Sequence, residues 1–90
     1  MSELTDLEFR IIDELYFVTS FNDLLDLMNE DQSKLPDGLK GLLEKELITQ
    51  LVFDENLKDY RRLDTPDLEA LERSCFVASK QGLLIHNSRS

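Results

Sequence analysis

The side chains that most often carry covalent or metal chemistry are scarce in this chain. Cys75 is the only cysteine and His86 the only histidine among the 90 residues. A nucleophilic cysteine needs a base within hydrogen-bonding reach, whereas Cys75 falls in an apolar run, where cysteine is usually buried. A structural zinc site needs several cysteine or histidine ligands. We therefore expect no catalytic residue and no metal site, and we expect His86 to be solvated near a helix end.

Three other patterns resemble chemical motifs but lack the context that those motifs need. Gly38 and Gly41 have the Gly-x-x-Gly spacing of an RNA-binding loop, yet they fall inside a leucine-periodic helix. The segment 54–59 lacks the glycine and the final glutamate of a calcium loop. Adjacent acids such as Asp13 and Glu14 lie on an exposed helix face, away from any apolar pocket that could tune a general acid. The chain is predicted not to be an enzyme and to bind no cofactor.

Charge is the feature that bears most directly on partners. Lys and Arg number 10 and Asp and Glu 19, so that the net charge is −9. Most of the excess lies in residues 1–31, where Arg10 is the only basic residue. An acidic surface repels phosphates and favours a basic partner, although solvated acidic faces also keep small proteins soluble. DNA binding is therefore disfavoured by the net charge, and a protein partner is favoured.

Apolar residues at helical spacing predict three helices in the first half of the chain. The first begins at a capping box opened by Thr5, the second begins at Ser20, and the third spans about 33–46. Gly38 and Gly41 weaken the third helix, since each costs about 1 kcal/mol relative to alanine. Their presence suggests that another backbone approaches closely or that local stability is low.

Some apolar residues of these helices lie off the main stripe. Phe9 and Tyr16 face away from the stripe of the first helix, so that helix needs a second packing partner. Either a C-terminal element of the same chain or a second copy in a homodimer would supply it. Leu27 lies off the stripe of the second helix and is either simply exposed or part of a contact. Phe9, Tyr16 and Leu27 are the candidate residues of a protein interface.

The second half of the chain alternates β-branched or aromatic runs with turn residues, a pattern typical of short strands. Thr65 and Pro66 have the cap and first-position chemistry of a helix start. The expected strands are 16–18, 48–53, 60–63 and 75–78, and the expected helices of this half are 65–73 and 80–87.

Two stretches resemble the winged-helix domains of bacterial transcription regulators. Residues 39–48 (LKGLLEKELI) are similar to the end of the recognition helix and the start of the wing, with Glu46 where that family prefers glycine. Residues 76–84 (FVASKQGLL) resemble the exit from the second wing strand, and Gly82 matches. The chain is also similar to small acidic bacterial proteins of this type.

The resemblance implies an α+β, mainly helical fold for residues 1–90 as a single domain. That fold is a winged helix-turn-helix with three N-terminal helices, a β-wing carrying a helical insertion at about 54–74, and a short C-terminal helix. A fold of this kind hosts many functions, so the resemblance bears on function only weakly.

Two functions are compatible with these observations. The first is a regulatory or adaptor module that acts through protein contacts at Phe9, Tyr16 and Leu27. The alternative is a DNA-binding transcriptional regulator that uses helix 33–46 and the wing, although Asp37 and Glu44 on the outward face of that helix are unlike a major-groove reader. The basic residues that would contact DNA are Lys34, Lys40, Lys45, Arg61 and Arg62.

The compartment follows from the cysteine count and the absence of targeting signals. A single cysteine cannot form an intramolecular disulfide. The N-terminal residues lack the basic and apolar regions of a signal peptide, and no apolar run approaches the length of a membrane span. We expect a cytoplasmic protein without a membrane partner.

Overall fold

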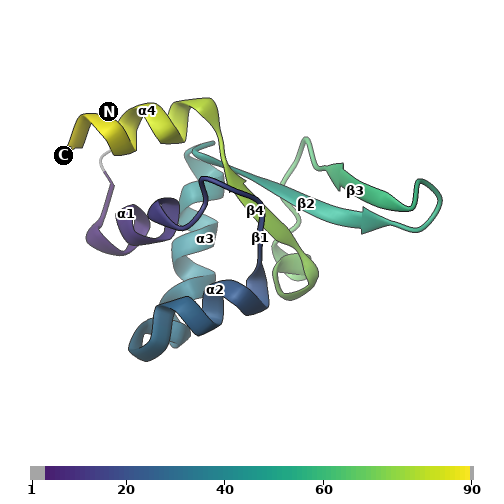
Figure 1. The fold of residues 1–90 in the computed structure, drawn as a ribbon, viewed down its shortest axis with the longest axis horizontal. Helices are drawn as coiled ribbons and strands as arrows, with labels where there is room; N and C mark the ends of the chain where they lie inside the picture. Colours follow the sequence, from purple (N-terminus) through teal and green to yellow (C-terminus); the bar gives the residue numbers. More distant parts are fainter. Residues whose placement is uncertain (1–3, 90) are drawn as a thin grey trace.

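A computed structural model describes residues 4–89 of the chain. Over this range the fold is α+β, with four α-helices, two 3-10 helices and a four-stranded antiparallel sheet (Figure 1). In chain order the elements are α1 (Asp6–Asp13), β1 (Thr19–Ser20), α2 (Phe21–Met28), η1 (Asn29–Lys34), α3 (Leu35–Glu44), β2 (Ile48–Asp54), β3 (Asp59–Arg62), η2 (Leu68–Arg73), β4 (Cys75–Ala78) and α4 (Lys80–Arg89). None of the helices within residues 4–89 combines the length and the apolar character that crossing a membrane would require.

The strands lie in the order β1-β4-β2-β3. The two strands expected at 48–53 and 75–78 are confirmed as neighbours, since β2 and β4 pair with Ile48 opposite Ala78 and Leu51 opposite Cys75. The segment between them adds β3 to the outer edge, in register with β2 from Leu51–Arg62 to Asp54–Asp59. The β2–β3 hairpin therefore extends away from the helices (Figure 1).

One face of the sheet packs on the helices. Because side chains alternate along a strand, Ile48 and Gln50 of β2 share a face with Phe76 and Ala78 of β4, and all four are buried. The intervening Thr49 is only half-buried. The inward apolar residues join the leucines and isoleucines of α1, α2 and α3 in one hydrophobic cluster. Burial of this cluster fixes how α3 and the hairpin are placed relative to each other.

The helix starts that local sequence predicts are confirmed in the first half of the chain. The Thr5 hydroxyl accepts from the Glu8 amide at 3.0 Å, and Glu8 accepts from the Thr5 amide at 3.0 Å, which completes the capping box. The Ser20 hydroxyl accepts from the Asp23 amide at 3.1 Å and caps α2. Both caps satisfy amides that the first turn of a helix leaves unpaired.

The strand expected at 16–18 is wrong. Pairing with β4 begins only at Thr19. The Thr19 hydroxyl donates to the carbonyl oxygens of Glu14, at 3.1 Å, and Phe17, at 2.9 Å, and these bonds bend the preceding loop. The bend turns Phe17 into solvent, where its exposed fraction is 83%.

The helix expected at 65–73 begins later and is a 3-10 helix. Asp67, rather than Thr65, caps it by accepting from the Glu69 amide at 3.1 Å. The buried Gln50 side chain explains the shift, because its amide group donates to the Asp67 carbonyl at 3.0 Å and accepts from the Asp67 amide at 2.9 Å. Asp67 is thereby bound to β2 and cannot enter the helix.

The two glycines of α3 make room for side chains of α1, so a close approach of another backbone, one of the two explanations suggested for them, is wrong. A Cβ added at Gly38 would lie 2.5 Å from the Ile11 Cδ1 atom, and one added at Gly41 would lie 2.6 Å from the Glu8 Oε2 atom. The backbone does approach closely at Gly82, where a Cβ would lie 2.0 Å from the Leu47 carbonyl oxygen.

Candidate interaction surfaces

Lys45, one of the expected DNA contacts, is partly buried between the end of α3 and α1. Its Nζ atom is 2.6 Å from Oε1 of Glu8, whose exposed fraction is only 5%. This ion pair joins the end of α3 to the first turn of α1. Since a buried carboxylate needs a compensating charge, Lys45 has a structural role that competes with contact to a phosphate.

Lys34 and Arg61 also have carboxylate partners within the chain. The Lys34 Nζ atom lies 3.6 Å from Asp31 Oδ1, and the same carboxylate accepts a hydrogen bond from Arg10. The Arg10 hydrogen bond holds the pKa of Asp31 below its usual value. On the hairpin, Arg61 Nε lies 3.3 Å from Asp54 Oδ2. These pairs reduce the charge that either cation offers to a phosphate.

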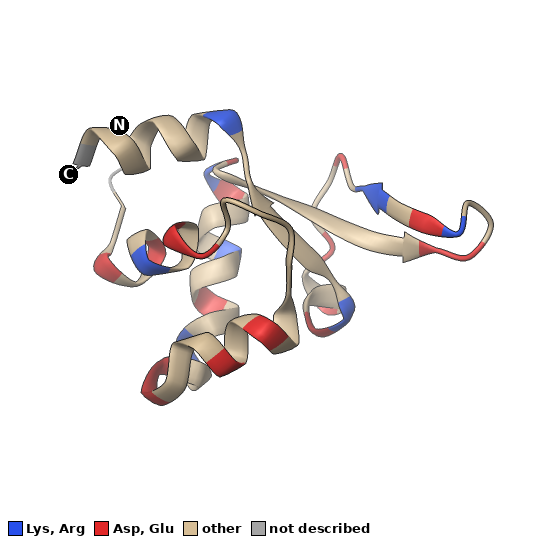
Figure 2. Ribbon diagram, viewed as in Figure 1, with Lys and Arg blue, Asp and Glu red and all other residues tan. Residues whose placement is uncertain are grey.

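Lys40 and Arg62 have no ion-pair partner among the side chains that the structure describes. Lys40 borders a 160 Å³ hollow whose other lining residues include Glu69 and Glu72 of η2. Arg61 and Arg62 are consecutive in β3, so their side chains point to opposite faces. The basic residues are interspersed with acids along α3 and the hairpin (Figure 2). They do not form a continuous basic strip.

A groove that the sequence did not predict lies beside the C-terminal end of α3. Two adjoining hollows of 240 and 360 Å³ form this groove, and both are lined by Leu43, Glu46 and Pro66. The smaller hollow continues along β2 to the hairpin, whereas the larger one continues to η2. We call these two hollows together the α3–hairpin groove. Its further lining residues include Glu44, Ile48, Arg62, Asp64 and Leu68.

The backbone around Glu46 shapes one wall of this groove. The Leu47 amide donates to the Leu42 carbonyl at 3.0 Å, and the Glu46 amide donates to the Leu43 carbonyl at 3.1 Å. These two bonds are the Schellman pattern that ends a helix. Glu46 has φ of 60°, in the left-handed region that favours glycine. Glycine adopts this conformation without strain, and the turn ends α3 at Glu44, two residues before the expected end.

The rim of the groove is mainly acidic. Glu44, Glu46 and Asp64 contribute carboxylates, whereas Arg62 is the single basic lining residue among those described. None of the three carboxylates has an ion-pair partner among the described side chains. Pro66 and the half-exposed Leu68 give the larger hollow an apolar floor, whereas Thr49, Gln50 and Arg62 add polar groups to the smaller one. The groove thus combines an apolar floor in its larger part with a negative rim.

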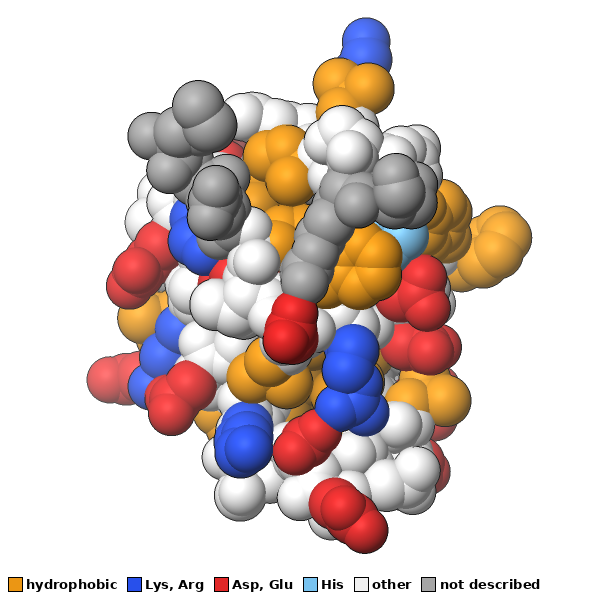
Figure 3. Space-filling view, turned by 90° about the vertical axis from the view of Figure 1, so that its left-hand side faces the viewer, with side chains coloured by type: hydrophobic (Ala, Val, Ile, Leu, Met, Phe, Trp, Pro, Cys, Tyr) orange, Lys and Arg blue, Asp and Glu red, His pale blue; other side chains and the backbone are white. Residues whose placement is uncertain are grey.

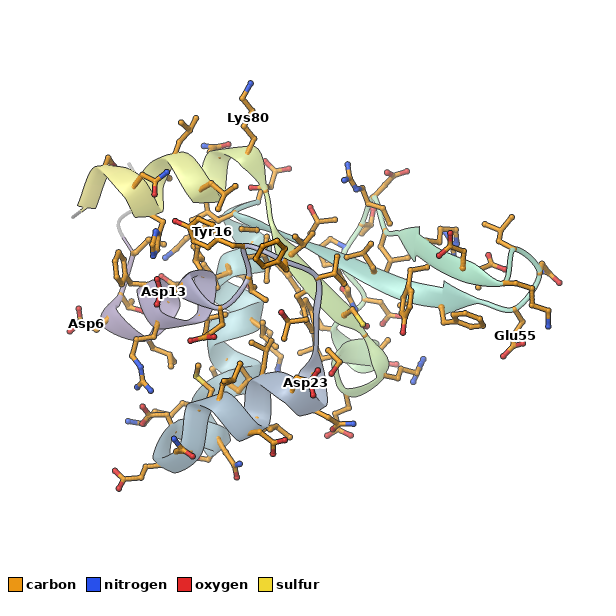
Figure 4. The ribbon with its side chains drawn as sticks, viewed as in Figure 1. Asp6, Asp13, Tyr16, Asp23, Glu55 and Lys80 are labelled. Atoms are coloured by element: carbon orange, nitrogen blue, oxygen red, sulfur yellow. The ribbon has the colours of Figure 1, made fainter. Side chains whose placement is uncertain are left out.

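A second cluster forms where α4 packs on α1. His86 is buried, with an exposed fraction of 8%, so the expectation of a solvated residue is wrong. Its ring stacks on Phe9 with centroids 4.2 Å apart and planes at 14°. Its Nδ1 atom lies 2.8 Å from the Tyr16 hydroxyl, and its Nε2 atom lies 3.2 Å from Asp13 Oδ1. Tyr16 lies between α1 and α4, with Asp13 on α1 (Figure 4).

This arrangement decides what covers the second face of α1. The C-terminal helix of the same chain covers part of it, since Phe9 and Tyr16 both contact His86 of α4, while Tyr16 stays 43% exposed. Around the histidine, hydrophobic side chains gather above a group of acidic ones (Figure 3). Leu27 lies apart on α2, half-exposed. The structure therefore brings together only two of the three residues expected at a protein interface.

The chemistry-bearing residues are engaged in packing. Cys75 is buried, and contact with its thiol raises the pKa of the Tyr60 hydroxyl. His86 is held instead by Phe9 and Tyr16. Within the described part of the chain, no group of three or more His, Cys, Asp or Glu side chains is placed to hold a metal ion.

Comparison with known proteins identifies no relative of this chain. No protein-family model, no curated protein and no solved structure matches it. Its function must be inferred from its own surfaces, which are the α3–hairpin groove and the α1–α4 cluster.

Proposed function

We propose that this chain is a non-enzymatic winged-helix module that acts as a regulatory or adaptor protein by binding another protein. The winged-helix assignment is supported by the helix pair α2 and α3, which is followed by the β2–β3 hairpin. It is also supported by the strand order, since β4 lies between β1 and β2. In this assignment, β2 and β4 are the two wing strands, and β3 and η2 form the insertion that enlarges the wing.

The observation that carries the functional proposal is the pairing of the basic residues expected to contact DNA. Lys34, Lys45 and Arg61 each lie within an ion pair. Binding to DNA depends largely on lysine and arginine that neutralise phosphates. The negative rim of the α3–hairpin groove would repel a phosphate backbone approaching α3. The same rim attracts lysine and arginine side chains, which favours a basic protein partner.

Binding to DNA through α3 and the hairpin remains the alternative function. The unpaired Lys40 and Arg62 favour it, because one belongs to α3 and the other to β3. Two phosphate contacts would give a slope of only about −2 in a plot of log K against log salt concentration. All five expected contacts would give about −4.5. The slope therefore distinguishes contact by Lys40 and Arg62 alone from contact by all five basic residues.

The test compares two labelled probes by fluorescence anisotropy, at low and at physiological salt. One probe is a random DNA duplex and the other a peptide of alternating leucine and lysine. We expect the peptide to bind, more weakly at the higher salt, and the duplex to show no measurable affinity at physiological salt. A peptide of alternating leucine and glutamate is the control. Duplex binding with a slope near −4.5, and no binding of the basic peptide, would overturn the proposal.

A further inference from the structure

We infer that the α3–hairpin groove is the binding site for the partner, and that it takes a segment in which an aliphatic side chain adjoins a lysine or arginine. This inference rests on the proposed protein-binding function and adds to it a location and a partner chemistry. It follows from three features of the groove, which are its apolar floor, its unpaired carboxylates and the backbone that holds Glu46 in place.

The floor of the groove has room for an aliphatic side chain. The two hollows of 240 and 360 Å³ adjoin at Leu43, Glu46 and Pro66. Each is several times larger than the roughly 30 Å³ that one water molecule occupies in the liquid. Leu68 borders the larger hollow and is 43% exposed. An aliphatic side chain of a partner would cover Leu68 and displace water from an apolar surface.

The rim specifies the charge of the bound segment. Glu44, Glu46 and Asp64 have no cationic partner among the described side chains, in contrast to Glu8 and Asp54, which are paired. Glu46 lines both hollows, and its helix-ending turn is fixed by two backbone hydrogen bonds. The turn holds this carboxylate between the two parts of the groove. A lysine or arginine next to the aliphatic residue would bind there.

Two further observations decide against other occupants. A second copy of the chain carries the same net charge of −9 and would meet like charges at the groove. A peptide strand added to the edge of β3 would compete with an existing bond, since the Tyr60 amide already donates to Asp59 Oδ1 at 2.7 Å. A basic segment lying in the groove avoids both obstacles.

The test uses the full chain and the labelled leucine–lysine peptide. The groove variant combines Glu46→Gln and Asp64→Asn, and the matched control combines Asp26→Asn and Glu30→Gln, two exposed acids outside the groove. Both variants lose the same charge. We expect the groove variant to bind about fivefold more weakly, as expected from the loss of two exposed charge pairs, and the control to bind within about twofold of the parent.

Amide chemical shifts of the isotope-labelled chain give a second readout. We expect the peptide to shift amides of residues 43–48 and 62–68, and Leu68→Ser to weaken binding without changing its salt dependence. Peptide binding that shifts other residues and is equal for the two charge variants would overturn the groove while leaving a protein-binding function. Failure of the parent chain to bind the basic peptide would overturn both the groove and the proposed function.

Discussion

The α1–α4 cluster and the α3–hairpin groove both carry apolar side chains close to the surface, but a later element of the chain packs only on the first. At the α1–α4 cluster, Phe9 and Tyr16 pack against His86 of the same chain, although Tyr16 stays 43% exposed. At the groove, apolar and acidic side chains meet without such a cover. The comparison teaches that exposed-looking residues in a sequence become interface candidates only if no later element of the chain packs on them.

Charged residues obey the same rule. Lys45 and Lys34 are equally plausible DNA contacts in the sequence, yet Lys45 pairs with a buried carboxylate and Lys34 with one at the surface. Removing the cation of the first pair would leave a buried carboxylate without a compensating charge, whereas the surface pair contributes little. Three substitutions test these structural roles, beginning with the one that has the largest expected effect on stability.

Gly82→Ala should disrupt the contact between the start of α4 and the end of α3. The new Cβ would lie 2.0 Å from the Leu47 carbonyl oxygen, so either α4 or the end of α3 must move. We expect a loss of about 3 kcal/mol in the free energy of unfolding, at the upper end of the usual cost of overpacking. Denaturant unfolding measures it, and Gly38→Ala is the control, since it meets the flexible Ile11 side chain. Equal losses in the free energy of unfolding for the two variants would contradict this account of the contact between Gly82 and Leu47.

Lys45→Met tests whether the partly buried Lys45 contributes more to stability than the exposed Lys34. It leaves the Glu8 carboxylate buried without its charge partner, which we expect to cost about 2 kcal/mol. Lys34→Met removes an exposed ion pair and should cost less than about 0.5 kcal/mol. Thermal unfolding of the two variants at one pH and salt concentration gives the difference. If Lys34→Met were the more destabilising, the structural role of Lys45 would be refuted.

Glu46→Gly should have the smallest effect and the opposite sign. Glycine adopts φ of 60° without the steric cost that a side chain incurs. We expect the free energy of unfolding to rise by about 1 kcal/mol, while affinity for the basic peptide falls. Unfolding and peptide binding measured on one sample would show both changes. A rise in stability with unchanged affinity would mean that this carboxylate takes no part in binding.

By itself, the sequence determined part of the local structure of this protein. The Thr5 and Ser20 caps, the strands near 48–53 and 75–78, the final helix from Lys80 and the burial of Cys75 all follow from residues within a few positions of one another. Caps and hydrophobic periodicity act over one or two turns or along a single strand, so they can be recognised without tertiary contacts.

Only the tertiary structure decided which residues are available to a partner. The Lys45–Glu8 pair spans 37 positions of the chain and the Tyr16–His86 contact spans 70. The start of η2 depends on Gln50, which lies 17 positions before Asp67. The groove exists because the end of α3, the hairpin and the segment before η2 meet in space. Such contacts depend on how whole elements pack, and no local pattern encodes that packing.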